Sequence, residues 1–195
     1  TAVLRRHEVE ARPSLFFDVS SDACLEVLDG LTGIAGYFHG AYWTFAPDLE
    51  DAAALTIGAL ELLGVAFNII CFATQVERLI RDNPNLRVVL RTDALTSALT
   101  LPAETQNSPV LVAIYQWLRA HPAFILLESR VIVAHTFGET NPFADKLSRF
   151  EWSAFYRLCS QIGVRPYEVP VPDDAMQGLR AGLEAARLRQ HQGGA

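Results

Sequence analysis

The sequence is poor in cysteine, lysine and methionine, and it has fewer basic than acidic residues. Three cysteines, an odd number set far apart at 24, 71 and 159, exclude a disulfide framework and show no zinc-ligand spacing. They suit a reducing, intracellular compartment. The formal net charge of −6 argues against a free-standing nucleic-acid binder, which normally has a surplus of Lys and Arg on one face. Lys146 is the single lysine, so phosphate contacts would fall mainly to arginine.

The chain shows no basic-then-apolar signal peptide at its start, but it contains one long hydrophobic run, residues 52–73. The run is about as long and as apolar as a membrane-spanning helix. Glu61 lies near its middle, where a carboxylate is costly in lipid, and no Lys or Arg closely precedes it to set an orientation. We therefore expect a buried helix and no membrane association. A membrane-associated α/β protein built on this run is the lesser alternative.

The remaining segments predict an α/β fold. With 195 residues, half of them hydrophobic, the chain suits one well-buried domain. Three short runs between residues 14 and 45 predict an antiparallel meander ahead of the long helix. Residues 86–92 then predict a buried strand, 109–120 a helix, 125–136 a strand, and 142–162 one long helix. With a short helix after Asp93, the expected order is βββαβααβα in a mixed five-stranded sheet flanked by helices.

Beyond Gly163 the composition changes, because prolines at 166, 170 and 172 interrupt an extended stretch before a final helical segment. We expect a domain over residues 1–162 and a C-terminal extension or linker over 163–195. The sequence leaves open whether this appendage packs on the domain.

Four acids occur at hydrophobic positions of different predicted elements: Asp18, Glu61, Asp93 and Asp145. Burying a carboxylate without a partner is costly, so these acids need compensation, and metal ions supply it. Each also has a simpler explanation. Asp18 could be a turn residue, Asp93 could cap a helix, and Asp145 could be an ordinary first-turn acid. Glu61 is the hardest to explain as a solvated residue, since nearly all its neighbours are apolar.

Several segments together resemble the ribonuclease H domain of retroelement reverse transcriptases, most of all the divergent versions in tyrosine-recombinase-type retroelements. Phe17-Asp18-Val19-Ser20 resembles the first-strand Asp-x-Ser of that family, and residues 59–63 resemble its Glu-Leu helix. Residues 91–98 resemble its Thr-Asp segment. Residues 138–149 give the most specific match, to Gly-x-x-Asn-x-x-Ala-Asp-x-Leu-Ser-Arg. The similarity extends over about residues 14–150.

The resemblance implies a ribonuclease H-like fold and a metal-dependent endonuclease of a retrotransposon polyprotein that hydrolyses the RNA strand of RNA–DNA hybrids. Four carboxylates can hold two Mg²⁺ or Mn²⁺ ions, one activating water and the other stabilising the leaving oxygen. Asp18 would bridge both ions, Glu61 and Asp93 would hold the first, and Asp145 the second. The expected partners are the hybrid and the reverse transcriptase portion of the same polyprotein. Weaker candidates for substrate contact are Ser20, Ser97, Asn107 and Arg149.

The chain departs from the family pattern in three respects. The loop before the last acid lacks the histidine found in many cellular members, and His135 lies earlier, within a predicted strand, where it could be structural or line the site. Asp22 adds a second acid near the first, so either Asp18 or Asp22 could face the ions. The basic handle that some members use on the hybrid is missing.

Two further alternatives stay open on the sequence alone. Tyr37, Tyr42, Trp43 and Phe45 could stack on bases, although packing within the sheet and core is the simpler expectation. The chain could also be a catalytically silent ribonuclease H-like scaffold or protein-interaction domain. Retention of all four acids favours the enzyme.

Overall fold

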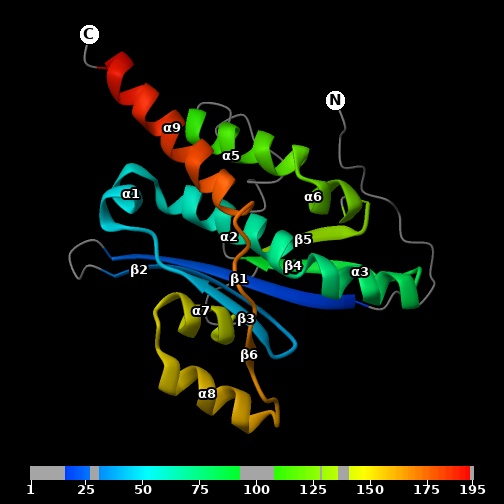
Figure 1. Ribbon diagram of the computed structural model, residues 1–195. Helices are drawn as coiled ribbons and strands as arrows, with labels where there is room; N and C mark the ends of the chain where they lie inside the picture. The colour runs from blue at the N-terminus through cyan, green and yellow to red at the C-terminus, as the bar shows by residue number, and fades with distance from the viewer. Residues whose placement is uncertain (1–15, 27–30, 93–107, 128, 136–140, 194–195) are drawn as a thin grey trace.

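The computed structural model describes the chain over residues 16–26, 31–92, 108–127, 129–135 and 141–193. Within these ranges one sheet crosses the molecule, with helices on both of its faces (Figure 1). The six described strands are β1 (Phe16–Glu26), β2 (Leu31–Phe38), β3 (Ala41–Phe45), β4 (Arg87–Thr92), β5 (Val131–His135) and β6 (Tyr167–Glu168).

The sheet is mixed, with the order β5-β4-β1-β2-β3-β6. β1, β2 and β3 form an antiparallel meander, whereas β4 pairs parallel to β1 and β5 pairs parallel to β4. β1 therefore lies inside the sheet between an antiparallel and a parallel neighbour. The predicted α/β class, with a mixed sheet flanked by helices, is confirmed. The predicted number of five strands is wrong, because the short β6 adds a parallel sixth strand beside β3.

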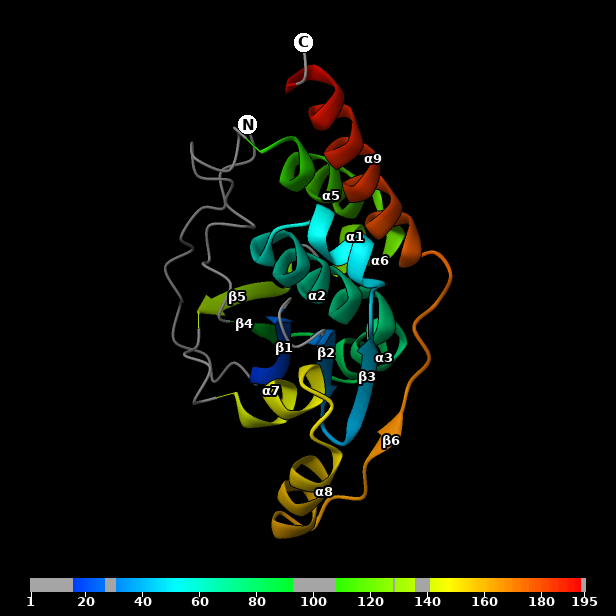
Figure 2. The same cartoon turned by 90° about the vertical axis from the view of Figure 1, so that its left-hand side faces the viewer.

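The helices form layers on the two faces of the sheet (Figure 2). α2 (Ile57–Cys71) lies directly on one face, and α5 and α9 lie above it, while α7 and α8 cover the opposite face. The remaining bounds are α1 (Leu49–Ala54), α3 (Ala73–Asp82), α5 (Pro109–Ala120), α6 (Pro122–Leu127), α7 (Pro142–Ser148), α8 (Trp152–Gln161) and α9 (Met176–Gly193).

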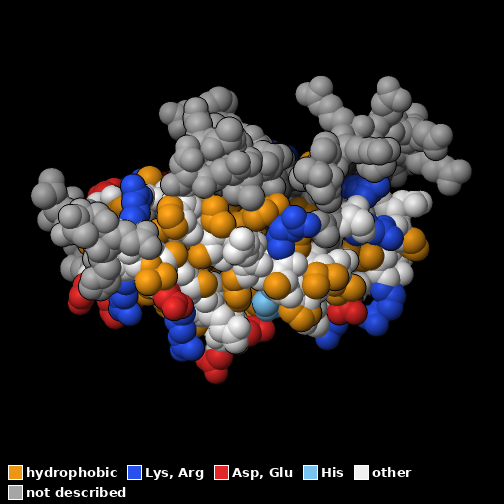
Figure 3. All heavy atoms as spheres, turned by 90° about the horizontal axis from the view of Figure 1, so that it is seen from above, with side chains coloured by type: hydrophobic (Ala, Val, Ile, Leu, Met, Phe, Trp, Pro, Cys, Tyr) orange, Lys and Arg blue, Asp and Glu red, His pale blue; other side chains and the backbone are white. Residues whose placement is uncertain are grey.

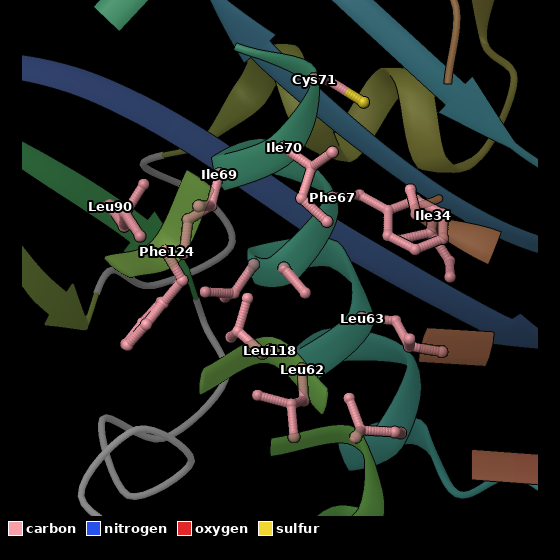
Figure 4. Close-up of a cluster of buried hydrophobic side chains, with 14 of the residues drawn as sticks. Ile34, Leu62, Leu63, Phe67, Ile69, Ile70, Cys71, Leu90, Leu118 and Phe124 are labelled. Atoms are coloured by element: carbon pink, nitrogen blue, oxygen red, sulfur yellow. The ribbon is translucent and has the colours of Figure 1, made fainter. Parts of the chain in front are cut away.

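α2 carries the main hydrophobic core. It begins after Thr56, whose side chain accepts a hydrogen bond from the Ala59 amide at 3.3 Å and so caps the helix. In Figure 4, Leu63 and Phe67 point towards Ile34 of the sheet, while Leu62 lies beside Leu118 of α5. Apolar side chains thus surround α2 on several sides, because it is packed between the sheet and an outer helical layer.

A smaller core lies between the sheet and the α7–α8 pair. Its buried residues are Ala35, Tyr37, Tyr42, Leu147, Phe155 and Cys159. The Tyr37 ring stacks on Phe143 with 4.4 Å between centroids. Trp43 packs in the main core on the other face, and Phe45 packs against it. All four aromatic side chains, Tyr37, Tyr42, Trp43 and Phe45, therefore pack in the two cores, as the simpler of the two sequence interpretations predicts.

Two predicted elements are divided differently in the structure. The single helix expected over 142–162 is split into α7 and α8, because Phe150 adopts a left-handed backbone with φ of 55° that no helix can continue through. The strand expected over 125–136 begins only at Val131. The apolar residues before it form α6, in which Ile125 and Leu126 are 62% and 53% exposed.

The C-terminal segment packs on the rest of the chain. Val169 donates its amide to the Tyr42 carbonyl at 2.7 Å beside the β3–β6 pair, and α9 then lies along α5. Leu179, Leu183 and Ala186 of α9 are buried in the main core. The sequence left open whether residues 163–195 pack on the domain, and in the structure they do.

Within the described ranges, no single helix has both the length and the apolar composition needed to cross a membrane. The pair α2 and α3 passes that test only when the two are taken together, and they are bent by 56° at their junction. Most residues of α2 are buried among other side chains of the chain, which is also typical of a helix in a protein core.

Candidate functional site

The site region is the part of β1 that extends past the end of β4. Ser20 pairs with Arg91 in the last β1–β4 pair, and β4 ends at Thr92, whereas β1 continues to Glu26. α2 passes over this part of β1, and α7 lies under it. Elements carrying the predicted acids therefore approach β1 from both faces and from the end of β4.

Asp22 is the acid at the centre of this region. It lies in β1 opposite Ala35 of β2 and is only 5% exposed. The hydroxyl of Ser148, at the end of α7, lies 2.5 Å from Asp22 Oδ2 and donates to it. A buried carboxyl group needs such a hydrogen-bond partner.

The other first-strand acid, Asp18, lies four residues nearer the start of β1. Its backbone pairs with Val89 of β4, well before β4 ends. The Asp18 side chain is outside the described part of the structure.

Glu61 lies in α2, one turn before the point where that helix crosses β1. A Cβ placed on Gly64 would lie 3.5 Å from Ser21 Cβ and 3.8 Å from the Asp22 carbonyl oxygen, so the helix backbone closely approaches the strand there. α2 runs antiparallel to β1 in Figure 1. Glu61, at the earlier end of the helix, is therefore displaced from this crossing towards the end of β1. Its side chain is partly buried and has a partner.

Asp145 lies in the first turn of α7 and is held by two cations. Its Oδ2 is 3.0 Å from Lys146 Nζ, and its Oδ1 is 3.0 Å from Arg149 Nε. Hydrogen bonding to Asp145 raises the pKa of both basic side chains, with Glu151 adding to the effect at Lys146 and Glu26 at Arg149. Both therefore stay cationic, and Asp145 belongs to a network of charges.

Arg149 connects that network to the end of β1. Its Nη1 contacts the Glu26 carboxylate, and its Nε contacts Asp145. The guanidinium thus bridges two acids from two elements, which its planar fork of donors suits. Cys24, between Asp22 and Glu26, is buried, and this burial raises the pKa of its thiol.

The other predicted site residues are less fully described. Asp93, Ser97 and Asn107 lie outside the described residues. The Ser20 hydroxyl is 3.5 Å from the Tyr37 carbonyl oxygen. His135 ends β5 and pairs with Thr92 of β4, and its side chain is also outside the description.

Asp22 bonds to α7, which also carries Asp145 and covers one face of the sheet, whereas Glu61 belongs to α2 on the opposite face. Among the residues whose side chains the structure describes, no three or more His, Cys, Asp and Glu form a group that could hold a metal ion. The described residues do not include Asp93 or the side chain of Asp18. Sequence reasoning named Asp22 only as a rival and missed Glu26. The acids at every fourth position of the first strand, 18, 22 and 26, were the available signal for Asp22.

Comparison of the chain with protein-family models, curated protein sequences and solved structures found no match.

Proposed function

We propose that the chain is a ribonuclease H-like, metal-dependent endonuclease that hydrolyses the RNA strand of RNA–DNA hybrids within a retroelement polyprotein. The observation that carries this proposal is Asp22, a buried carboxylate on the interior strand of the sheet, bonded to the helix that bears Asp145. The mixed sheet of six strands flanked by helices is compatible with that fold. The motif resemblance supplies the reaction type.

The strand register supports Asp22 over Asp18 as the first-strand ligand. Since Ser20 pairs with Arg91, Ser21 is level with Thr92 and Asp22 comes one residue later. Asp93 is covalently joined to Thr92, so their Cα atoms are about 3.8 Å apart. Asp18 is level with Val89, about 13 Å along β1 from Asp22 at roughly 3.3 Å per residue.

The proposed metal ligands are Asp22, Glu61, Asp93 and Asp145. Their donors are all carboxylate oxygens, which fit Mg²⁺ or Mn²⁺ better than zinc. When bound, such ions lower the pKa of a bound water and stabilise the charge on the leaving oxygen. Lys146 and Arg149 both contact the Asp145 carboxylate, and Arg149 is suited to contact a substrate phosphate. The reverse transcriptase portion of the polyprotein would supply further basic surface for the hybrid.

The test is cleavage of a hybrid labelled on its RNA strand, with Mg²⁺ or Mn²⁺ present. We expect Asp22→Asn to lower the cleavage rate at least about 100-fold, which is about 2.7 kcal/mol of transition-state stabilisation. Asp18→Asn is the matched control, because it makes the same substitution four residues earlier in the same strand. Equal loss in both variants, or loss only in Asp18→Asn, would overturn the choice of Asp22.

One observation favours the second candidate, a catalytically silent scaffold. Both oxygens of Asp145 already contact a cation of the chain itself, Lys146 or Arg149. A scaffold would use these ion pairs only to hold α7 in place. It would bind neither Mn²⁺ nor Mg²⁺ in calorimetry, and Asp145→Asn would then change stability alone.

A further inference from the structure

Two buried polar side chains at the ends of α7 contact β1. Asn141 immediately precedes the helix and Ser148 is its last residue, and they are 4% and 0% exposed. They contact consecutive residues of the strand. Asn141 Nδ2 donates to the Ser21 carbonyl at 2.9 Å, and Ser148 Oγ donates to Asp22 Oδ2 at 2.5 Å.

The Asn141 contact provides a hydrogen bond to a backbone group of β1. Ser21 follows the last β1–β4 pair, and its carbonyl accepts from the Asn141 amide at the start of α7. Buried carbonyl groups require such partners. α7 therefore fixes the backbone of β1 immediately before Asp22.

The Ser148 contact fixes the side chain itself. Ser148 Oγ also lies 3.0 Å from the Asp145 carbonyl oxygen, but Asp22 Oδ2 is nearer, at 2.5 Å. α7 can lie this close to the sheet because Gly33 of β2 has no side chain. A Cβ at that position would be 2.0 Å from the Ser148 carbonyl oxygen.

We propose that Ser148 is a positioning residue for metal binding, which holds the Asp22 carboxylate in one orientation while Asn141 holds the strand that carries it. This inference rests on the proposed function and extends it to two residues outside the metal ligands. A ligand whose orientation is fixed in advance loses less conformational freedom when a cation binds. Loss of such a supporting hydrogen bond typically lowers metal affinity about 10–100-fold.

The experiment is calorimetric titration of Mn²⁺ into the full chain and its variants, without nucleic acid. We expect Ser148→Ala to weaken Mn²⁺ binding about 10–100-fold. Ser153→Ala, which removes an exposed hydroxyl from α8, is the matched control and should bind as the unaltered chain does. In an Asp22→Asn background, Ser148→Ala should have no further effect, because the bonded carboxylate is gone.

Thermal unfolding without metal checks that each variant is folded. If Ser148→Ala does not fold, Ser148→Cys keeps nearly the same volume with a weak donor, and the same loss of Mn²⁺ affinity is expected. Mn²⁺ binding by folded Ser148 variants equal to that of the unaltered chain would overturn this inference and leave the proposed function standing. No Mn²⁺ binding by the unaltered chain would overturn both.

Discussion

At the residue scale, the contacts that depend most on exact geometry are hydrogen bonds between buried polar groups. Trp43 is fully buried, and its Nε1 donates to Asn68 Oδ1 at 2.9 Å across the interface between β3 and α2. Asn68 Nδ2 has no hydrogen-bond partner among the described residues. Asn68 is a polar residue in the largely apolar α2, and its side-chain oxygen accepts the hydrogen bond that the buried Trp43 indole N–H requires.

We predict that Asn68→Ala destabilises the chain by about 1–3 kcal/mol, the usual cost of an unsatisfied buried donor. Urea unfolding followed by Trp fluorescence measures the change. Asn85→Ala, at an exposed position in the loop before β4, is the control and should change stability little. An effect of equal size in both variants would contradict the role given to the Trp43–Asn68 bond.

Cys71, at the end of α2, gives a prediction about pH. Burial, with a smaller contribution from Asp174, raises the pKa of its thiol to about 12, from about 9 in the unfolded chain. The folded state therefore holds the proton more tightly, so this stabilising contribution is complete below pH 9 and is lost as pH rises towards 12.

The measurement is thermal stability between pH 8 and pH 11 for the unaltered chain and for Cys71→Ala. We expect the loss of stability with rising pH to be shallower in the variant, because it lacks the shifted thiol. Alkylation of Cys71 by iodoacetamide at pH 8 should also be slow, since the thiolate is the reacting form. Fast alkylation of the folded protein would contradict the assigned burial.

At the element scale, α9 is fixed to α5 through a small residue. A Cβ placed on Gly178 would lie 2.3 Å from the Trp117 ring, so the two helices approach as closely as glycine allows. Three side chains of α9 complete the main core from this position. The C-terminal segment therefore contributes to the stability of the sheet domain.

We predict that Gly178→Val separates α9 from α5 and lowers stability by about 1–3 kcal/mol, the usual cost of overpacking. Hydrogen exchange read by mass spectrometry should show faster exchange over residues 176–190. Gly163→Val is the comparison variant, because a Cβ at that position would have no atom within 4 Å. Its φ of +69° adds backbone strain but no steric clash. Unchanged exchange in α9 for Gly178→Val would contradict close packing.

The elements predicted correctly had strong local signals. β4 follows the Asn83-Pro84-Asn85 turn, and α5 begins at Pro109, which suits a first helical turn. The elements predicted wrongly lacked such signals. α6 is an apolar run whose sequence is also typical of a strand, the two residues of β6 are too few for a pattern, and the left-handed Phe150 is an unusual residue for that conformation.

The candidate site was only partly predictable for a similar reason. Glu61 and Asp145 stood out by hydrophobic context and motif. The choice between Asp18 and Asp22 depends on which β1 residue is level with the end of β4, and that register is set by pairing between segments about 70 residues apart in sequence. The Ser148–Asp22 bond needs the same register together with the placement of α7.

At the scale of the whole molecule, the acidic balance bears most directly on the proposed function. On the face seen in Figure 3, acidic side chains lie mainly at the margin, whereas basic ones lie both at the margin and among the hydrophobic side chains of the middle. With a net charge of −6, the chain has limited means of attracting a polyanion by itself. We therefore expect hybrid binding to be weak at physiological salt and stronger at low salt.

The measurement that tests the central claim most directly is strand scission of an RNA–DNA hybrid at low salt, with each strand labelled in turn. Hybrid at several concentrations ensures that binding does not limit the result. We predict scission of the RNA strand alone, dependent on Mg²⁺ or Mn²⁺, abolished by chelation and lost in Asp93→Asn. Folded protein that binds the hybrid and the cation, yet cuts neither strand, would contradict the claim.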